Sequence, residues 1–126
     1  MFNAWSKIKE LINKKQNILN ITTGTEYETG RIIDGKKEYA KRINCGNLPN
    51  AQAKYVQTGL ENITLTRAIE GVMLSSNSQR GLPAPNITSG NTIMLYLNST
   101  GTVLTINTQF DWSSYAAYVE LFYTKN

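Results

Sequence analysis

The pair Asp34-Gly35 constrains the fold of this sequence most strongly, because it stands between two segments with strand character. Both central residues of a type I′ turn need a positive φ, which aspartate and glycine adopt at low cost. The pair therefore predicts a hairpin between strands at residues 25–33 and 36–44. A two-residue turn joins only antiparallel strands, so this part of the chain should form an antiparallel sheet.

The predicted hairpin is charged on both strands, which carry Arg31, Lys36, Lys37, Glu38, Lys41 and Arg42. Residues 1–54 hold ten Lys and Arg against five Asp and Glu, whereas residues 55–126 hold three against four. The basic excess thus belongs to the first part of the chain, where no nucleic-acid motif accompanies it, and we expect no nucleic-acid partner. Lysines also protect an edge strand from pairing with other chains, which is our interpretation of this hairpin.

The rest of the chain predicts further short strands at residues 54–58, 63–74, 92–97, 102–108 and 115–124. Gly71 is a candidate bulge within the strand at residues 63–74. Residues 45–50 are expected to be a loop because of Pro49, and the Ser-, Asn-, Gly- and Pro-rich residues 75–90 form the longest loop. The last strand is apolar on both faces, which places it at the centre of a sheet or beneath a second chain. About seven strands predict a mostly β chain folded as an antiparallel β-sandwich.

Residues 4–19 predict an amphipathic helix, with a break at residues 20–24. Its apolar seam follows a three-four spacing, which is typical of a coiled coil: Trp5, Ile8, Ile12 and Leu19, with Lys15 as an interruption. Because a helix of this length is marginal in water alone, it must pack across its own domain or against copies of itself. We divide the chain into a helical stalk at residues 1–23 and a sandwich domain at residues 24–126.

Most catalytic chemistry is missing from the sequence, which has no histidine and a single cysteine, Cys45. Catalytic triads, histidine-based zinc sites and an intrachain disulfide are therefore excluded, and we expect no metal or cofactor. Glu26 and Glu28 would lie on one strand face about 7 Å apart, a spacing that inverting glycosidases use. Any Glu-x-Glu strand provides this spacing, so a polysaccharide hydrolase is the least favoured function and we predict no enzyme.

No segment is apolar enough for membrane insertion, and the charged N-terminus differs from a secretory signal, so synthesis is expected in the cytosol. Binding is the function that remains. The expected turn at residues 111–114 holds Asp111 and Trp112, and Trp112 is interpreted either as a structural plug or as a flat platform for a sugar ring. With Arg80 and Asn77 from the long loop, these residues form the candidate ligand-binding set.

The order of five segments resembles the C-terminal head domain of tail-fibre or baseplate receptor-binding proteins of phages and prophages of Gram-positive bacteria. The resemblance covers about residues 25–126, through TGRIIDGKKEYAKRINCGNLPN, ITLTRAIEGVML, a Gly/Pro-rich loop, TIMLYLNSTGTVLTINT and SSYAAYVELFYTKN. It implies a homotrimer of β-sandwich heads on a stalk, located in the virion after synthesis in the bacterial host cytoplasm. Host cell-surface glycan or another cell-wall polymer would be the ligand, and other tail or baseplate proteins would be partners.

The resemblance favours self-association of the helix at residues 4–19 as a coiled-coil trimer stalk. It assigns no ligand residue, so the candidate set above depends on turn chemistry and composition alone. The alternative is a structural trimerisation or tip module of a tail fibre that has no ligand of its own.

Overall fold

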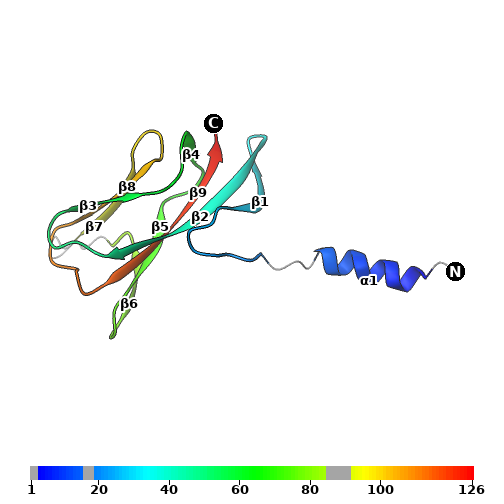
Figure 1. The fold of residues 1–126 in the computed structure, drawn as a ribbon, viewed down its shortest axis with the longest axis horizontal. Helices are drawn as coiled ribbons and strands as arrows, with labels where there is room; N and C mark the ends of the chain where they lie inside the picture. The colour runs from blue at the N-terminus through cyan, green and yellow to red at the C-terminus, as the bar shows by residue number, and fades with distance from the viewer. Residues whose placement is uncertain (1–2, 16–18, 85–91) are drawn as a thin grey trace.

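The computed structural model describes residues 3–15, 19–84 and 92–126 of the chain. These residues form one helix and nine strands, two more strands than the seven predicted (Figure 1). The elements are α1 Ala4–Lys15, β1 Tyr27–Ile33, β2 Lys36–Asn47, β3 Ala53–Gln57, β4 Ile63–Leu65, β5 Glu70–Leu74, β6 Gln79–Leu82, β7 Ile93–Leu97, β8 Val103–Thr108 and β9 Ala116–Lys125. The predicted mostly β class is confirmed.

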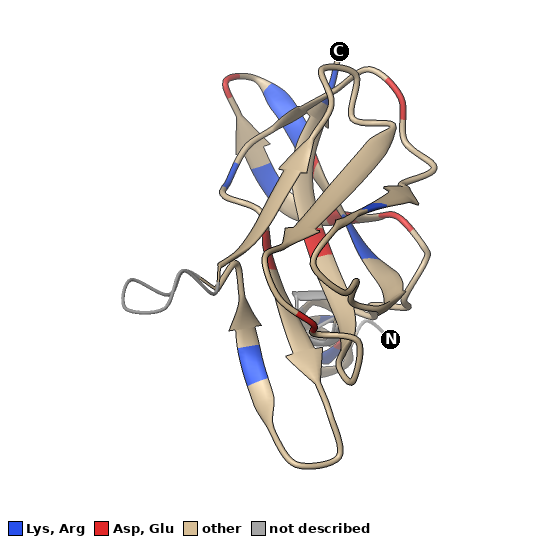
Figure 2. Ribbon diagram, turned by 90° about the vertical axis from the view of Figure 1, so that its left-hand side faces the viewer, with Lys and Arg blue, Asp and Glu red and all other residues tan. Residues whose placement is uncertain are grey.

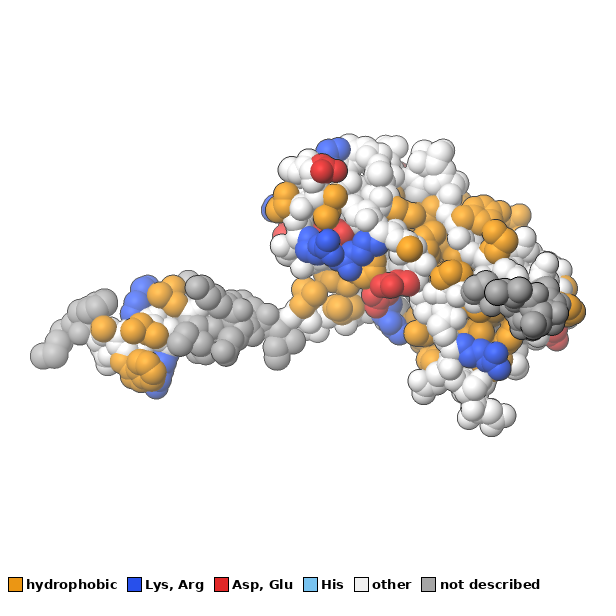
Figure 3. Space-filling model, turned by 180° about the vertical axis from the view of Figure 1, so that it is seen from behind, with side chains coloured by type: hydrophobic (Ala, Val, Ile, Leu, Met, Phe, Trp, Pro, Cys, Tyr) orange, Lys and Arg blue, Asp and Glu red, His pale blue; other side chains and the backbone are white. Residues whose placement is uncertain are grey.

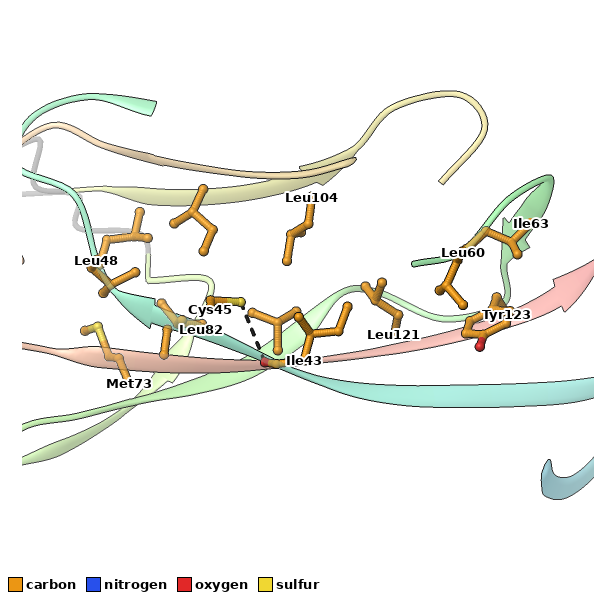
Figure 4. Close-up of a cluster of buried hydrophobic side chains, with 14 residues drawn as sticks. Ile43, Cys45, Leu48, Leu60, Ile63, Met73, Leu82, Leu104, Leu121 and Tyr123 are labelled. Carbon is orange, nitrogen blue, oxygen red and sulfur yellow. Dashed lines mark hydrogen bonds between the residues drawn. The ribbon is translucent and has the colours of Figure 1, made fainter. Parts of the chain in front are cut away.

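The strands form two antiparallel sheets in a sandwich-like arrangement. The larger sheet has the order β1-β2-β9-β5-β6, with β4 also pairing with β9, and the smaller sheet has the order β3-β8-β7. Buried side chains from both sheets fill the space between them, among them Ile43, Met73, Leu104 and Leu121 (Figure 4). Burying one such side chain contributes about 1.5–3 kcal/mol, so this layer holds the two sheets together.

The hairpin predicted from Asp34-Gly35 is confirmed, since these residues have φ values of 49° and 82° and Ile33 pairs with Lys36. The central position predicted for the last strand is also confirmed, because β9 pairs with β2, β4 and β5. The outer face of β9 is covered by cationic side chains from neighbouring segments. The Arg67 guanidinium lies 4.1 Å from the centre of the Phe122 ring, and that of Arg42 lies 4.7 Å from the centre of the Tyr118 ring.

The prediction of a loop at residues 45–50 is wrong in its first half, because β2 continues to Asn47. The register of β2 against β9 shifts between Asn44 and Gly46, and this bulge lets the strand continue past the glycine. Cys45 is therefore buried in the core rather than placed in a turn, and burial raises the pKa of its thiol to about 11.

The single strand predicted at residues 63–74 is divided into β4 and β5 by residues 66–69. Leu65 pairs with Tyr123 and Glu70 with Glu120, so four residues of one segment stand opposite two residues of β9. The two surplus residues bend the chain out of the sheet. Gly71 marks a close approach instead of a bulge, since a Cβ there would contact the Tyr118 carbonyl oxygen.

The loop predicted at residues 75–90 contains strand β6, which pairs with β5 through Met73 opposite Arg80, while residues 85–91 lie outside the described part. The strand signal was missed because β6 has only four residues, one of them a glycine. The β5–β6 hairpin projects at the lower end of the sandwich (Figure 2).

The helix α1 is shorter than predicted, and Leu19 lies outside it, so the predicted seam loses its last member. Asn3 caps the helix, because its Oδ1 accepts the backbone N–H groups of Trp5 and Ser6. Every side chain described in α1 is exposed, Trp5 by 60% and Ile8 by 45%, whereas that of Ile12 lies outside the described part (Figure 3). The helix is far too short to span a membrane.

Candidate functional site

The candidate site lies at the end of the sandwich where the β5–β6 turn meets the start of β9. Strand β5 pairs with β6 on one side and with β9 on the other, so it brings these two segments to the same end of the sheet. The turn at residues 75–78 is closed by a backbone bond from the N–H of Ser75 to the carbonyl of Ser78. This arrangement places Arg80 of β6 beside the residues that precede β9.

Arg80 is exposed and lies against two aromatic rings. Its guanidinium carbon is 5.5 Å from the centre of the Trp112 ring and 5.9 Å from that of Tyr115. Both distances are within the range of cation–π attraction, which contributes about 0.5–1 kcal/mol at exposed sites. The two rings meet edge to face at 5.4 Å and 62°. The cluster Arg80–Trp112–Tyr115 is therefore held in place before any ligand arrives.

Trp112 has features of both roles that the sequence suggested for it, the structural plug and the platform for a sugar ring. Its side chain is half-buried and packs against the hydrophobic core, as a plug would. Its backbone N–H donates to the carbonyl of Pro49, and its carbonyl accepts the N–H of Tyr115, so the turn that carries the ring is fixed. The remaining surface of the ring is next to Arg80, which gives it a polar neighbour.

Tyr115 and Ser78 belong to the cluster, and sequence reasoning missed both. The Tyr115 hydroxyl is 2.5 Å from the Ser78 hydroxyl, which joins the β5–β6 turn to the start of β9. This bond, together with the nearby Arg80, lowers the pKa of Tyr115. Tyr115 could have been found from its position in the sequence, three residues after Trp112 in a turn. This spacing puts the two aromatic rings on one side of the chain.

The other two predicted residues lie next to the cluster. Asp111 is exposed, and its Oδ1 accepts hydrogen bonds from the backbone N–H and the hydroxyl of Ser113. These bonds lower the pKa of Asp111, so its carboxylate is charged at neutral pH. Asn77 is exposed in the turn, where its backbone N–H donates to Ser75 Oγ. The structure thus brings Arg80 and Trp112 into contact and places Asn77 and Asp111 on the adjoining turns.

Three glutamates of the first hairpin region are engaged in ion pairs. Glu26 precedes β1 and lies 2.6 Å from Lys125, while Glu28 lies 3.5 Å from Lys37. The fully buried carboxylate of Glu38 contacts Arg67 and accepts bonds from two threonine hydroxyls. In the described part of the chain, no group of three or more Cys, Asp or Glu side chains is close enough together to bind a metal.

Comparison of the chain with protein-family models, curated proteins and solved structures finds no match.

Proposed function

We propose that this chain is the receptor-binding head of a phage tail fibre or baseplate, which attaches the particle to glycan or another polymer of the host cell wall. The observation that carries the proposal is the Arg80–Trp112–Tyr115 cluster, in which an exposed arginine lies against two half-buried aromatic rings. An arginine fixed against aromatic rings offers several N–H donors in a fixed plane next to apolar ring surface. Sugars have hydroxyl groups around an apolar ring face, so this combination suits them.

The neighbouring side chains support a polar, hydroxyl-rich ligand. Asn77 provides an amide that both donates and accepts, and Asp111 provides a carboxylate that accepts. Both are exposed on turns beside the cluster. Such a shallow site binds weakly, so a useful attachment requires several copies acting together.

The helix α1 supports assembly into a homotrimer. Trp5, Ile8 and Leu11 keep 60%, 45% and 48% of their surfaces exposed, although a helix of 12 residues is marginal in water on its own. Packing of these apolar side chains in a short coiled coil would bury them and stabilise the helix. Three heads on one stalk would then provide the multivalency that a shallow site needs.

The test is binding of the full chain to purified cell walls of candidate Gram-positive hosts. Arg80→Ala and Trp112→Ala should each weaken the measured binding at least tenfold, which corresponds to a loss of about 1.4 kcal/mol in the free energy of binding. Lys36→Ala, which removes an exposed charge at the opposite hairpin, is the matched control and should bind as the wild-type chain does. Thermal unfolding would show that each variant is folded, and unchanged binding by both site variants would refute the assignment.

The second candidate function is a structural tip or trimerisation module without a ligand. It is favoured by one observation, namely that the cluster satisfies its own contacts, since Arg80 already covers ring surface and Ser78 bonds Tyr115. A wild-type chain that assembles as a trimer but binds no host cell wall would support this second function. Release of new reducing sugar ends from the cell walls would instead indicate a hydrolase.

A further inference from the structure

The strand β7 forms one edge of the smaller sheet, and beyond Ile93 its outer backbone groups bond with no other residue that the structure describes. Ile93 turns its N–H and C=O away from β8, where they bond with Ala84 over 3.0 and 3.3 Å. Asn98, by contrast, donates its N–H to Val103 over 3.2 Å, on the side of β8. Because these directions alternate along an antiparallel strand, Leu95 and Leu97 also turn their backbone groups to the open side. No other described strand pairs with β7 there.

The other edge strands carry devices that discourage pairing, and β7 carries none. β1 has a bulge and lies among Arg31, Lys36 and Lys37, while β6 has four residues and includes Arg80. β4 has three residues, and β3 contains Lys54. Residues 93–97, IMLYL, have no charge, proline or glycine, and their register against β8 is regular. Natural sheets seldom leave such an edge exposed, because it readily pairs with another strand.

An apolar cleft runs along the same edge, on the inner side of the sheet. Its lining includes Leu95 and Leu97 of β7, Leu65 of β4, and Ile69 from the segment that joins β4 to β5. On the outer side of β7, Met94 and Tyr96 are 56% and 49% exposed. A strand added here would therefore find apolar contacts for its side chains on both faces.

We propose that β7 pairs with β7 of a second copy of this chain, antiparallel and centred on Tyr96. In this register Leu95 of each copy is opposite Leu97 of the other, and both residues of each pair turn outwards backbone groups that bond with no residue in the described ranges. Each pair can exchange two hydrogen bonds. The two Tyr96 side chains become direct neighbours on the outer face, where aromatic pairs are favourable.

The strand suits a second copy because pairing with itself brings together no like charges. A corresponding self-pairing of β1 would place Arg31 and the lysines of two hairpins next to one another, which is unfavourable. The two-fold axis also directs Leu95 and Leu97 of each copy towards the cleft of the other, because antiparallel neighbours keep their inner faces on the same side. The surface is therefore complementary to itself, as a two-fold interface requires.

Disulfide formation in the full chain tests the proposed register of β7 against β7 directly. Cysteines at position 96 would be a directly opposed, non-hydrogen-bonded pair with Cα atoms about 4.5 Å apart, which a disulfide can span. Tyr96→Cys should therefore form a disulfide-linked dimer under mild oxidation. Met94→Cys is the control, since position 94 is opposite position 98 and its two copies lie about 13 Å apart. Cys45 does not interfere, because it is buried in the core.

Sedimentation provides a second readout that does not depend on cysteine chemistry. Tyr96→Lys, on the exposed outer face, places two lysines side by side and should raise the dissociation constant at least tenfold, whereas Met94→Lys should change it less than threefold. If α1 also holds an assembly together, the wild-type particle should have twice the mass of the Tyr96→Lys particle. Equal masses, or equal cross-linking at positions 94 and 96, would overturn the proposal. Cell-wall binding by the Arg80–Trp112–Tyr115 cluster is a separate measurement, so either proposal can fail alone.

Discussion

Replacement of Glu38 by glutamine should destabilise the fold strongly, because Glu38 is a fully buried carboxylate that accepts hydrogen bonds from three side chains and pairs with a fourth, Arg31, at 3.9 Å. Arg67 Nη2 contacts Oε1, Thr29 donates its hydroxyl to Oε1 over 2.8 Å, and Thr66 donates its hydroxyl to Oε2. The hydrogen bond from Arg67 is the main reason that the pKa of Glu38 falls to about 2, and the two threonines add to it against the opposing effect of burial.

The magnitude follows from the pKa. An ordinary glutamate has a pKa of 4.5, and one pKa unit corresponds to about 1.4 kcal/mol, so the charged form of Glu38 is stabilised in the folded chain by about 3 kcal/mol. Glutamine keeps the shape but loses the charge, and its amide group cannot accept all the bonds that the carboxylate accepts. Arg67 keeps about a third of its side-chain surface exposed and can turn towards water, which reduces the loss. We expect the Glu38→Gln substitution to cost about 2–4 kcal/mol.

Urea unfolding followed by tryptophan fluorescence measures this cost. Glu28→Gln is the matched control, because its pair with Lys37 is exposed on both sides, and it should change the free energy of unfolding by less than about 0.5 kcal/mol. The dependence on pH provides an independent check. Since the pKa of Glu38 is lower in the folded chain, its contribution is complete above about pH 5 and is lost as the pH falls towards 2.

The free energy of unfolding of the wild-type chain should therefore fall more steeply between pH 5 and 2 than that of Glu38→Gln. The curves for the two chains should approach each other at the acid end, where Glu38 becomes protonated. Other carboxylates, including Asp111, contribute equally to both curves and cancel in the difference. Parallel curves, or a cost below about 1 kcal/mol at neutral pH, would refute the account of Glu38.

Three further predictions concern packing, reactivity and assembly. Gly71→Ala should lower the free energy of unfolding by about 1–3 kcal/mol in thermal unfolding, because the added methyl group meets the backbone of β9. Gly81→Ala is the control and should change the stability little, because the space around Gly81 is open. Cys45 should resist iodoacetamide at pH 8 in the folded chain and react in urea, since burial raises the pKa of its thiol to about 11; rapid labelling of the folded chain would contradict this. Replacing Trp5 and Ile8 together by serine should dissociate an assembly held by α1 without changing the unfolding temperature of the sandwich, as sedimentation and calorimetry would show.

The features that were predictable from sequence depend on local chemistry. The confirmed hairpin has Asp34-Gly35 at its turn, and the strands β7 and β8, which were expected at residues 92–97 and 102–108, are joined by the polar residues 98–101, which also favour a tight turn. The neighbourhood of Arg80 and Trp112 depends on a short strand, β6, that has too few residues for a periodic signal. Arg80 and Trp112 were predicted to lie together from their residue types alone. The contact that brings them together is the pairing of β5 with both β6 and β9, which are far apart in the sequence.

The division of residues 63–74 into β4 and β5 was not predictable, because it depends on strands far away in the sequence. A regular strand there would have placed Arg67 on the same face as Ile63 and Leu65. The surplus residues opposite β9 instead carry Arg67 across the Phe122 ring to Glu38 on β2. The interruption between β4 and β5 is what brings Arg67 to the buried carboxylate of Glu38. Neither of these two charges could be placed in the sheet without the other as its partner.

The two sheets differ in what their outer surfaces leave for recognition. On the larger sheet, Arg42 pairs with Glu120 and covers Tyr118, and Arg67 covers Phe122, so the outward aromatic rings of β9 already have cationic neighbours from the same chain. Strands β7 and β8 of the smaller sheet carry no charged residue. The contrast makes β7 an uncharged edge of the described sandwich, whereas the β1–β2 hairpin at an edge of the larger sheet carries several charges. Assembly and ligand binding would thus use different parts of one small domain, and variants at Tyr96 and Arg80 should affect them independently.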